Sequence, residues 1–233
     1  GETTTDADGK FDITFFAEGD ENIDVRTKPF YDFAIHADVT DVNGEVRSGD
    51  MSYSISQESL MLSVQAPEQS DFNKFNSIKV QTTNVQGKFT PTDVKVEFIK
   101  LEAPERFLKK RMWQAPKVNL LSQADFVKYF PDYEYKNESN PLFRKEGKTV
   151  WRKNVRTEEG KRIFLQKIAP NAGYYLLKAT ARDKDNKLIE EKKVVRMINT
   201  SRTRAETNEA LFTYITDGSV QPGDKTNLSI ASA

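Results

Sequence analysis

Residues 31–55 read YDFAIHADVTDVNGEVRSGDMSYSI. In the first nine of them, apolar side chains at odd positions alternate with polar or small side chains at even positions, which predicts a β-strand with one buried face. Asn43-Gly44 then predicts a tight two-residue turn, because both residues accept a positive φ. The alternation resumes in 51–55, so the stretch predicts a β-hairpin. Val46 is out of phase with that return strand, which predicts a bulge near Ser48-Gly49.

Segments of the same kind flank this hairpin on both sides. They are short, they alternate, and Gly, Asn, Asp or Pro residues separate them, as in antiparallel β-sandwiches. We expect strands at 11–15, 60–66, 76–83, 94–98, 163–168, 175–181, 188–198 and 210–215, with a last apolar pair at Leu228 and Ile230. The sequence therefore predicts an all-β fold of tandem immunoglobulin-like antiparallel sandwiches.

Residues 102–161 do not follow this pattern of short alternating strands and turns. They are rich in aromatic and charged residues and lack regular alternation, so we interpret them as a long insertion packed on a sandwich. Ser122 is a good helix N-cap and Asp125 occupies the favourable third position, which predicts a helix start there. Pro131 limits that helix to about two turns, because proline disfavours helix at the residue before it.

The hairpin pattern occurs twice. Phe33 to Val46 matches Tyr175 to Leu188 at an offset of 142 residues, including the turn residues Asp41 and Asp183. Glu58-Ser59-Leu60-Met61 matches Glu209-Ala210-Leu211-Phe212 at an offset of 151. Both registers indicate that a unit closes with a long hairpin and that the next unit opens with Glu-[Ser/Ala]-Leu.

These registers divide the chain into three parts. We expect residues 1–57 to be the C-terminal half of one sandwich, 58–208 a complete sandwich with its insertion at 102–161, and 209–233 the first strands of a third. Two strands are too few for a core. We therefore predict that 209–233 pairs with 1–57, pairs with another molecule, or lacks order.

Composition limits the classes of function that fit this chain. Lys plus Arg and Asp plus Glu balance at 35 each, which gives no support for nucleic-acid binding. No apolar run approaches the roughly 20 residues of a membrane span. Cysteine is absent, which removes disulfides and thiolate chemistry from this segment. The chain begins inside strand-like sequence, so we expect its targeting segment to lie elsewhere.

Residue patterns that could perform chemistry are sparse. His36 is the only histidine, which excludes a His-based triad or a multi-histidine metal site, and its place on the polar strand face predicts an exposed side chain. Asp6-Ala7-Asp8-Gly9 lacks the further ligands of a calcium loop and predicts a turn.

Two charged stretches in the insertion remain as candidates. Arg106 to Trp113 mixes basic and aromatic residues, as nucleic-acid or carbohydrate surfaces do, although a solvated face is the favoured interpretation. Asp132, Glu134 and Glu138 could supply an acid pair for glycoside hydrolysis, although a surface loop is favoured. We assign no catalytic, cofactor-binding or metal-binding residue, and we expect a non-enzymatic protein without a cofactor.

The chain resembles the macroglobulin-like β-sandwich repeats of bacterial α2-macroglobulins, particularly those of the Bacteroides group. The resemblance rests on short motifs in order, which cover all but residues 102–161. They are Thr5 to Phe11, Tyr31 to Glu45 with Val39-Thr40-Asp41, Gly173 to Asp183, and Gln221-Pro222-Gly223-Asp224.

This resemblance implies a multi-domain, exported protein of the periplasm or cell envelope that traps proteases, with these sandwiches as its scaffold. The implied partners are neighbouring domains of the same chain and, through the full-length protein, proteases. Many members use a Cys-Gly-Glu-Gln thioester, which this cysteine-free segment does not contain. The alternatives are a cell-surface adhesin or glycan-binding module that uses the insertion, and an accessory domain of a hydrolase, since fold alone does not fix function.

Overall fold

The computed structural model describes residues 1–20, 23, 29–56, 58–109, 111–114, 116–165, 168, 171–199, 212–215 and 221–231. The elements in this part of the chain are β1 (Phe30–Thr40), β2 (Val46–Ser56), β3 (Met61–Gln65), β4 (Gln69–Asp71), β5 (Ser77–Thr83), β6 (Asp93–Leu101), α1 (Gln123–Tyr129), the 3-10 helix η2 (Pro141–Phe143), β7 (Glu146–Arg156), β8 (Arg162–Phe164), β9 (Gly173–Arg182), β10 (Leu188–Ile198), β11 (Phe212–Ile215) and β12 (Leu228–Ala231).

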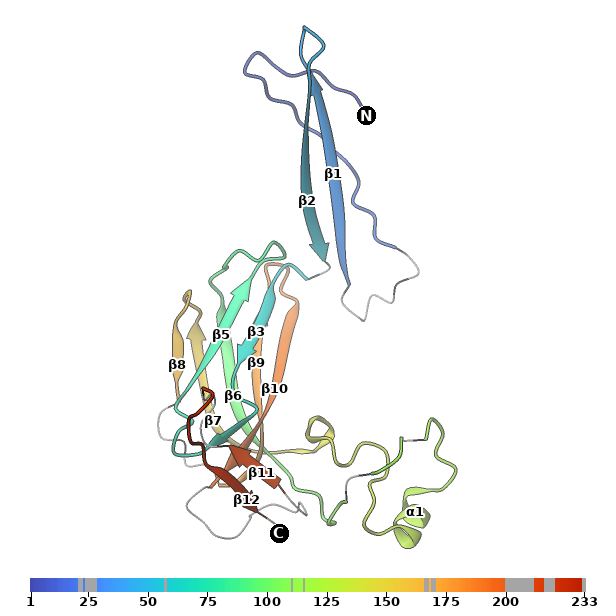
Figure 1. Ribbon diagram of the computed structural model, residues 1–233, viewed down its shortest axis with the longest axis vertical. Coiled ribbons are helices and arrows are strands. Elements are labelled where there is room, and N and C mark those ends of the chain that lie inside the picture. Colours follow the sequence, from blue (N-terminus) through green and yellow to red (C-terminus); the bar gives the residue numbers. More distant parts are fainter. Residues whose placement is uncertain are drawn as a thin grey trace.

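A β-sandwich occupies the centre of the molecule (Figure 1). One sheet has the strand order β4-β10-β9-β6-β7, and the other has the order β3-β5-β8. All pairings in these sheets are antiparallel except that of β4 with β10. This arrangement confirms the predicted all-β, immunoglobulin-like sandwich for the described central residues.

The core lies between the two sheets. It is built from the alternating inward side chains that the sequence pattern identified, among them Ile78, Val96 and Leu177, each at most 1% exposed. The Phe98 ring stacks on the Tyr175 ring at 4.7 Å between centroids. Full burial of each such side chain contributes roughly 1.5–3 kcal/mol, so this double layer supplies the main stabilisation.

The expected limits of the insertion were wrong at the C-terminal side. Residues 146–156 form β7, which pairs with β6 at the edge of the larger sheet, so the inserted segment spans 102–145. Register shifts after Phe98 and Ile99 interrupt the ladder between β6 and β7. Val150 and Trp151 are therefore both partly buried although they are neighbours, and such a β-bulge hides the period-two pattern.

The hairpin of β1 and β2 forms as predicted, but two details differ. Its register is continuous from Phe30–Ser56 to Thr40–Val46, so the expected bulge is absent, and Gly49 simply lies opposite Ala37. The turn has three residues between Asp41 and Glu45, with only Gly44 at positive φ. Besides two-residue turns, three-residue turns that end in a glycine with positive φ are common in β-hairpins.

The expected strand at 11–15 was also wrong. Residues 10–20 contain no strand, although their apolar side chains do lie against the hairpin, with Phe15 and Phe33 ring centroids 5.6 Å apart. At the other end of the chain, β11 pairs with β12. Among the described residues, neither strand pairs with residues 1–57. No helix in the described part of the chain is long and apolar enough to cross a membrane.

Candidate functional site in the inserted segment

The inserted segment brings its two charged stretches together. We call residues 105–113 the first arm and residues 131–139 the second arm. The backbone N–H of Lys109 donates to the Asp132 carbonyl at 2.7 Å, and Lys109 and Tyr133 form a parallel β-bridge. Helix α1 precedes the second arm. Ser122 caps it, because the Ser122 Oγ accepts from the Asp125 N–H at 3.2 Å, as the sequence predicted.

Ion pairs of opposite residues join the arms. Arg106 pairs with Glu138, Lys109 Nζ lies 2.8 Å from Asp132 Oδ2, and Arg111 Nη2 lies 3.7 Å from Glu134 Oε1. Every one of the acidic residues considered for an acid pair is therefore matched by a cation of the basic stretch. We refer to these pairs as the ion-pair ladder.

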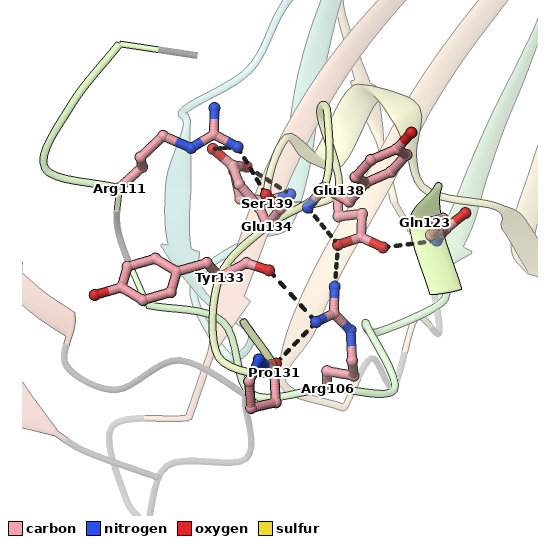
Figure 2. A network of polar contacts seen from close by, with 9 residues as sticks. Arg106, Arg111, Gln123, Pro131, Tyr133, Glu134, Glu138 and Ser139 are labelled. Carbon is pink, nitrogen blue, oxygen red and sulfur yellow. Dashed lines mark hydrogen bonds and ion pairs between the residues drawn. The ribbon is translucent and has the colours of Figure 1, made fainter. Parts of the chain in front are cut away.

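Arg106 contacts three residues of the second arm (Figure 2). Its Nη1 donates to the carbonyls of Pro131 at 2.8 Å and Tyr133 at 3.4 Å, while its Nη2 donates to Glu138. Glu138 in turn accepts from the Tyr135 N–H and from Gln123 Nε2 of α1. Arg106 therefore fixes the second arm and the helix relative to the first arm.

Arg111 and Glu134 are the most buried pair of the ladder. The Arg111 side chain is 8% exposed, and its Nη2 donates to the Glu134 carbonyl at 2.7 Å. Ser139 donates to the Glu134 carboxylate through both its hydroxyl and its N–H. These hydrogen bonds satisfy two partly desolvated charges, as such a pair requires.

Lys109 and Asp132 are the most exposed pair of the ladder. Both side chains are about half exposed, and their hydrogen bond raises the pKa of Lys109 above its ordinary value. Exposed pairs of this kind contribute little to stability.

Aromatic rings surround the ladder. The Trp113 and Tyr133 ring centroids lie 5.0 Å apart, and the Phe126 and Tyr135 centroids 5.5 Å apart. The Tyr135 hydroxyl donates to the Leu121 carbonyl at 3.1 Å. Trp113 is still 54% exposed, so its ring remains accessible to a ligand.

This arrangement weighs against both chemical interpretations of the two stretches. A cation engaged by a carboxylate attracts phosphate less than a free one does. Glycoside hydrolysis needs two carboxyl groups free to reach the glycosidic bond, whereas each of these three carboxylates is engaged by a cation. The geometry instead fits a structural network that holds an irregular segment in one conformation.

His36 and Asp6 lie elsewhere. His36 is exposed on β1, where its Nδ1 lies 2.6 Å from Asp50 Oδ1 of β2 and its Nε2 lies 3.2 Å from Asp38 Oδ1. The hydrogen bond to Asp50, followed by the charge of Asp38, raises the pKa of His36. Asp6 Oδ1 accepts from the N–H groups of Asp8 and Lys10, so it closes a turn. No group of three or more metal-ligating side chains gathers in the residues that the structure describes.

Sequence reasoning identified both stretches of the ladder but not their pairing, and it missed Gln123 and Ser139. The available signal was the opposite charge of two stretches within one insertion, which allows pairing without fixing it. No protein-family model matches this chain, and no curated protein matches it.

Proposed function

We propose that this chain is a non-catalytic scaffold segment of a longer array of β-sandwich modules. Its residues act by packing and by holding successive modules in register. The array belongs to an exported protease-trapping protein of the α2-macroglobulin-like kind, located in the periplasm or cell envelope.

One observation is the main support for this proposal, namely the geometric repetition of a whole hairpin. At the offset of 142 residues that relates Asp41 to Asp183, β2 coincides with β10 at both ends. Cross-strand partners follow the same offset, because Phe33 pairs with Tyr53 and Tyr175 pairs with Val195. Two like hairpins at the ends of successive units are what a tandem array requires.

The contacts at the joint between β2 and the central sandwich fit the same proposal. Gln86 Nε2 donates to the Ser54 carbonyl at 3.1 Å, which ties the end of the hairpin to the turn after β5. Just beyond the joint, Ser59 Oγ donates to Asp183 Oδ2 at 3.1 Å. The first contact joins the two units, and the second lies within the central unit, where it anchors the start of the chain segment that follows the hairpin.

The test uses the full-length protein that contains this segment. A protease that is enclosed by an array is shielded from large substrates, whereas small peptides still reach its active site. We expect the full-length protein to slow hydrolysis of a large protein substrate and to leave hydrolysis of a short peptide substrate largely unchanged.

The 233-residue segment alone is the control, and it should leave both reactions unchanged because it only supplies scaffold. Unchanged hydrolysis of the large substrate by the full-length protein would contradict the protease-trapping proposal. Equal inhibition of both substrates would contradict enclosure and indicate a blocked active site.

A second candidate is a glycan-binding or adhesive module. It is favoured by the accessible rings of the inserted segment, with Trp113 54% and Tyr129 63% exposed, since such rings can stack on sugar faces. A glycan array probed with the chain, and with Trp113→Ala and Phe16→Ala as matched ring-removal variants, tests it. Absence of binding, or equal loss in both variants, would exclude this site.

A further inference from the structure

Strand β7 forms one edge of the larger sheet. It pairs with β6 on one side, and among the described residues no strand pairs with its other side. Residues 151–156 form an uninterrupted ladder with β6, whereas the register shifts lie before Trp151. A regular edge strand presents a row of N–H and C=O groups to which another extended segment can add.

The backbone of this edge shows which groups can receive an added strand. Just after β7, the Thr157 N–H donates to the Thr92 carbonyl at 2.9 Å, so Thr157 faces the segment that leads into β6. Main-chain groups alternate in direction along a strand, and every second residue counted back from Thr157 therefore also faces β6. The N–H and C=O groups of Arg152, Asn154 and Arg156 point away from β6, toward the edge.

On the sheet face that points away from the core, this edge is cationic. Glu97 of β6 lies opposite Lys178 of β9 and opposite Arg152 of β7, so the charge alternates across three strands. Arg152 Nε donates to Glu97 Oε1 at 2.7 Å, and Arg156 Nη1 lies 3.1 Å from Asp93 Oδ2. The two arginine side chains are 58% and 64% exposed. Each guanidinium has five donors, so it can bind a second carboxylate on its outer side.

Lys153 restricts which strands can add at this edge. It lies opposite the core residue Val96, so it is on the core-side face of the sheet, and it is exposed. A charge at this place disfavours an apolar strand, and it repels the like-charged edge of a second copy. A carboxylate opposite Lys153 would remove this penalty. Trp151 and Val155, on the same face, pack against the core and offer apolar contacts beside it.

We propose that β7 binds an extended acidic segment of a partner protein. The segment adds antiparallel to residues 151–156 as a further strand of the larger sheet, which continues the antiparallel pairing of β6 with β7. Its main-chain groups bond to the outward groups of β7, and its carboxylates meet the cations of this edge. The binding surface belongs to the sandwich itself, so it does not depend on the proposed array.

The residues of β7 define the sequence that fits. Side chains opposite the three cations of 151–156 are acidic, the one opposite Asn154 is polar, and those opposite Trp151 and Val155 are apolar. In antiparallel order, starting opposite Arg156, this pattern is Glu-Val-Thr-Asp-Glu-Val. The probe is a peptide of this sequence with an acetylated N-terminus and an amidated C-terminus. A control peptide has lysine at each acidic position.

Titration of the isotopically labelled 233-residue chain with the acidic peptide tests the proposal by NMR. We expect saturable shifts of the β7 amides with a Kd below about 1 mM. Near saturation, hydrogen exchange at the N–H groups of Arg152, Asn154 and Arg156 should slow by at least about tenfold, because each gains a hydrogen bond. The lysine peptide should change neither the shifts nor the exchange. Absence of binding, or binding without slower exchange at these three amides, would overturn the proposal.

Charge reversal tests the register. Arg156→Glu should weaken binding of the acidic peptide by more than about tenfold, because two carboxylates would lie opposite each other. A peptide with lysine in place of its first Glu should recover binding to this variant. Lys161→Glu is the matched control, since it makes the same charge change in the loop between β7 and β8, and it should weaken binding by less than about threefold. Equal weakening by both variants would indicate diffuse charge attraction and overturn the proposed strand addition.

Discussion

At the residue scale, the buried hydroxyl groups of Thr82 and Thr157 form a hydrogen-bond network in this sandwich. Thr82 is 0% exposed, and its Oγ1 donates to the Thr90 carbonyl while lying 2.6 Å from Thr157 Oγ1. Thr157 Oγ1 also accepts from the Thr92 N–H at 2.9 Å. These contacts join the end of β7 to the start of β6 and the end of β5.

We predict that Thr157→Val destabilises the chain by about 1–3 kcal/mol, because it leaves the Thr92 N–H without its acceptor in a partly buried place. Urea unfolding followed by fluorescence measures the change. Thr40→Val, on the exposed hairpin, is the control and should change the unfolding free energy by less than about 0.5 kcal/mol. Equal effects of both substitutions would argue against the hydroxyl network.

His36 should titrate above its ordinary pKa of 6.5, because Asp50 and Asp38 stabilise the imidazolium. The NMR shifts of its ring protons measure this pKa. Asp50→Asn and Asp38→Asn should each lower it toward the ordinary value. A pKa at or below 6.5 in the unsubstituted chain would contradict the observed contacts.

The sign of the His36 effect on stability follows from the same shift. Because the pKa is raised in the folded state, the imidazolium stabilises the hairpin fully below the unfolded-state pKa. This stabilisation is lost as the pH rises through the folded-state pKa. It should therefore be absent in alkaline solution.

At the scale of elements, one turn geometry occurs four times in the described residues. Asp6, Asp41, Asn84 and Asp183 each bond through the backbone N–H to the carbonyl four residues later, and each side-chain oxygen accepts from a following N–H. The fourth turn residue has positive φ in each case: Gly9, Gly44, Gly87 and Asn186. Turn chemistry alone thus explains the shared turn residues of the repeat, and the argument for repetition rests on strand limits and register.

The ion-pair ladder predicts that Arg106→Met loosens only the inserted segment. This substitution keeps a long unbranched side chain and removes the charge. It breaks the hydrogen bonds to Pro131, Tyr133 and Glu138, so amide exchange in 131–139 should accelerate by at least about tenfold. The unfolding midpoint of the sandwich should stay the same, because the ladder lies outside its core.

Lys109→Met is the matched control for this experiment, since its ion pair with Asp132 is exposed. It should accelerate exchange much less. A loss of global stability with Arg106→Met, or no change in exchange, would contradict a ladder that acts locally.

At the scale of the whole molecule, the buried cluster consists of residues between Leu60 and Met197. We predict that residues 58–208 expressed alone unfold in one cooperative transition, with nearly the midpoint of the main transition of the full chain. Calorimetry measures both. A segment that is unfolded in isolation would show that residues outside 58–208 are required for the core.

The sequence by itself determined the local parts of this protein. Alternation placed the inner residues of β5, β6, β9 and β10, the Ser122 cap marked α1, and turn residues located the hairpins, because these patterns depend on neighbours in the chain. Only the tertiary structure decided that β7 joins the larger sheet, that β4 lies parallel to β10, and that Arg106 meets Glu138. Such pairings join segments far apart in sequence, and an apolar face or a charge defines the kind of partner it needs without defining which one it meets.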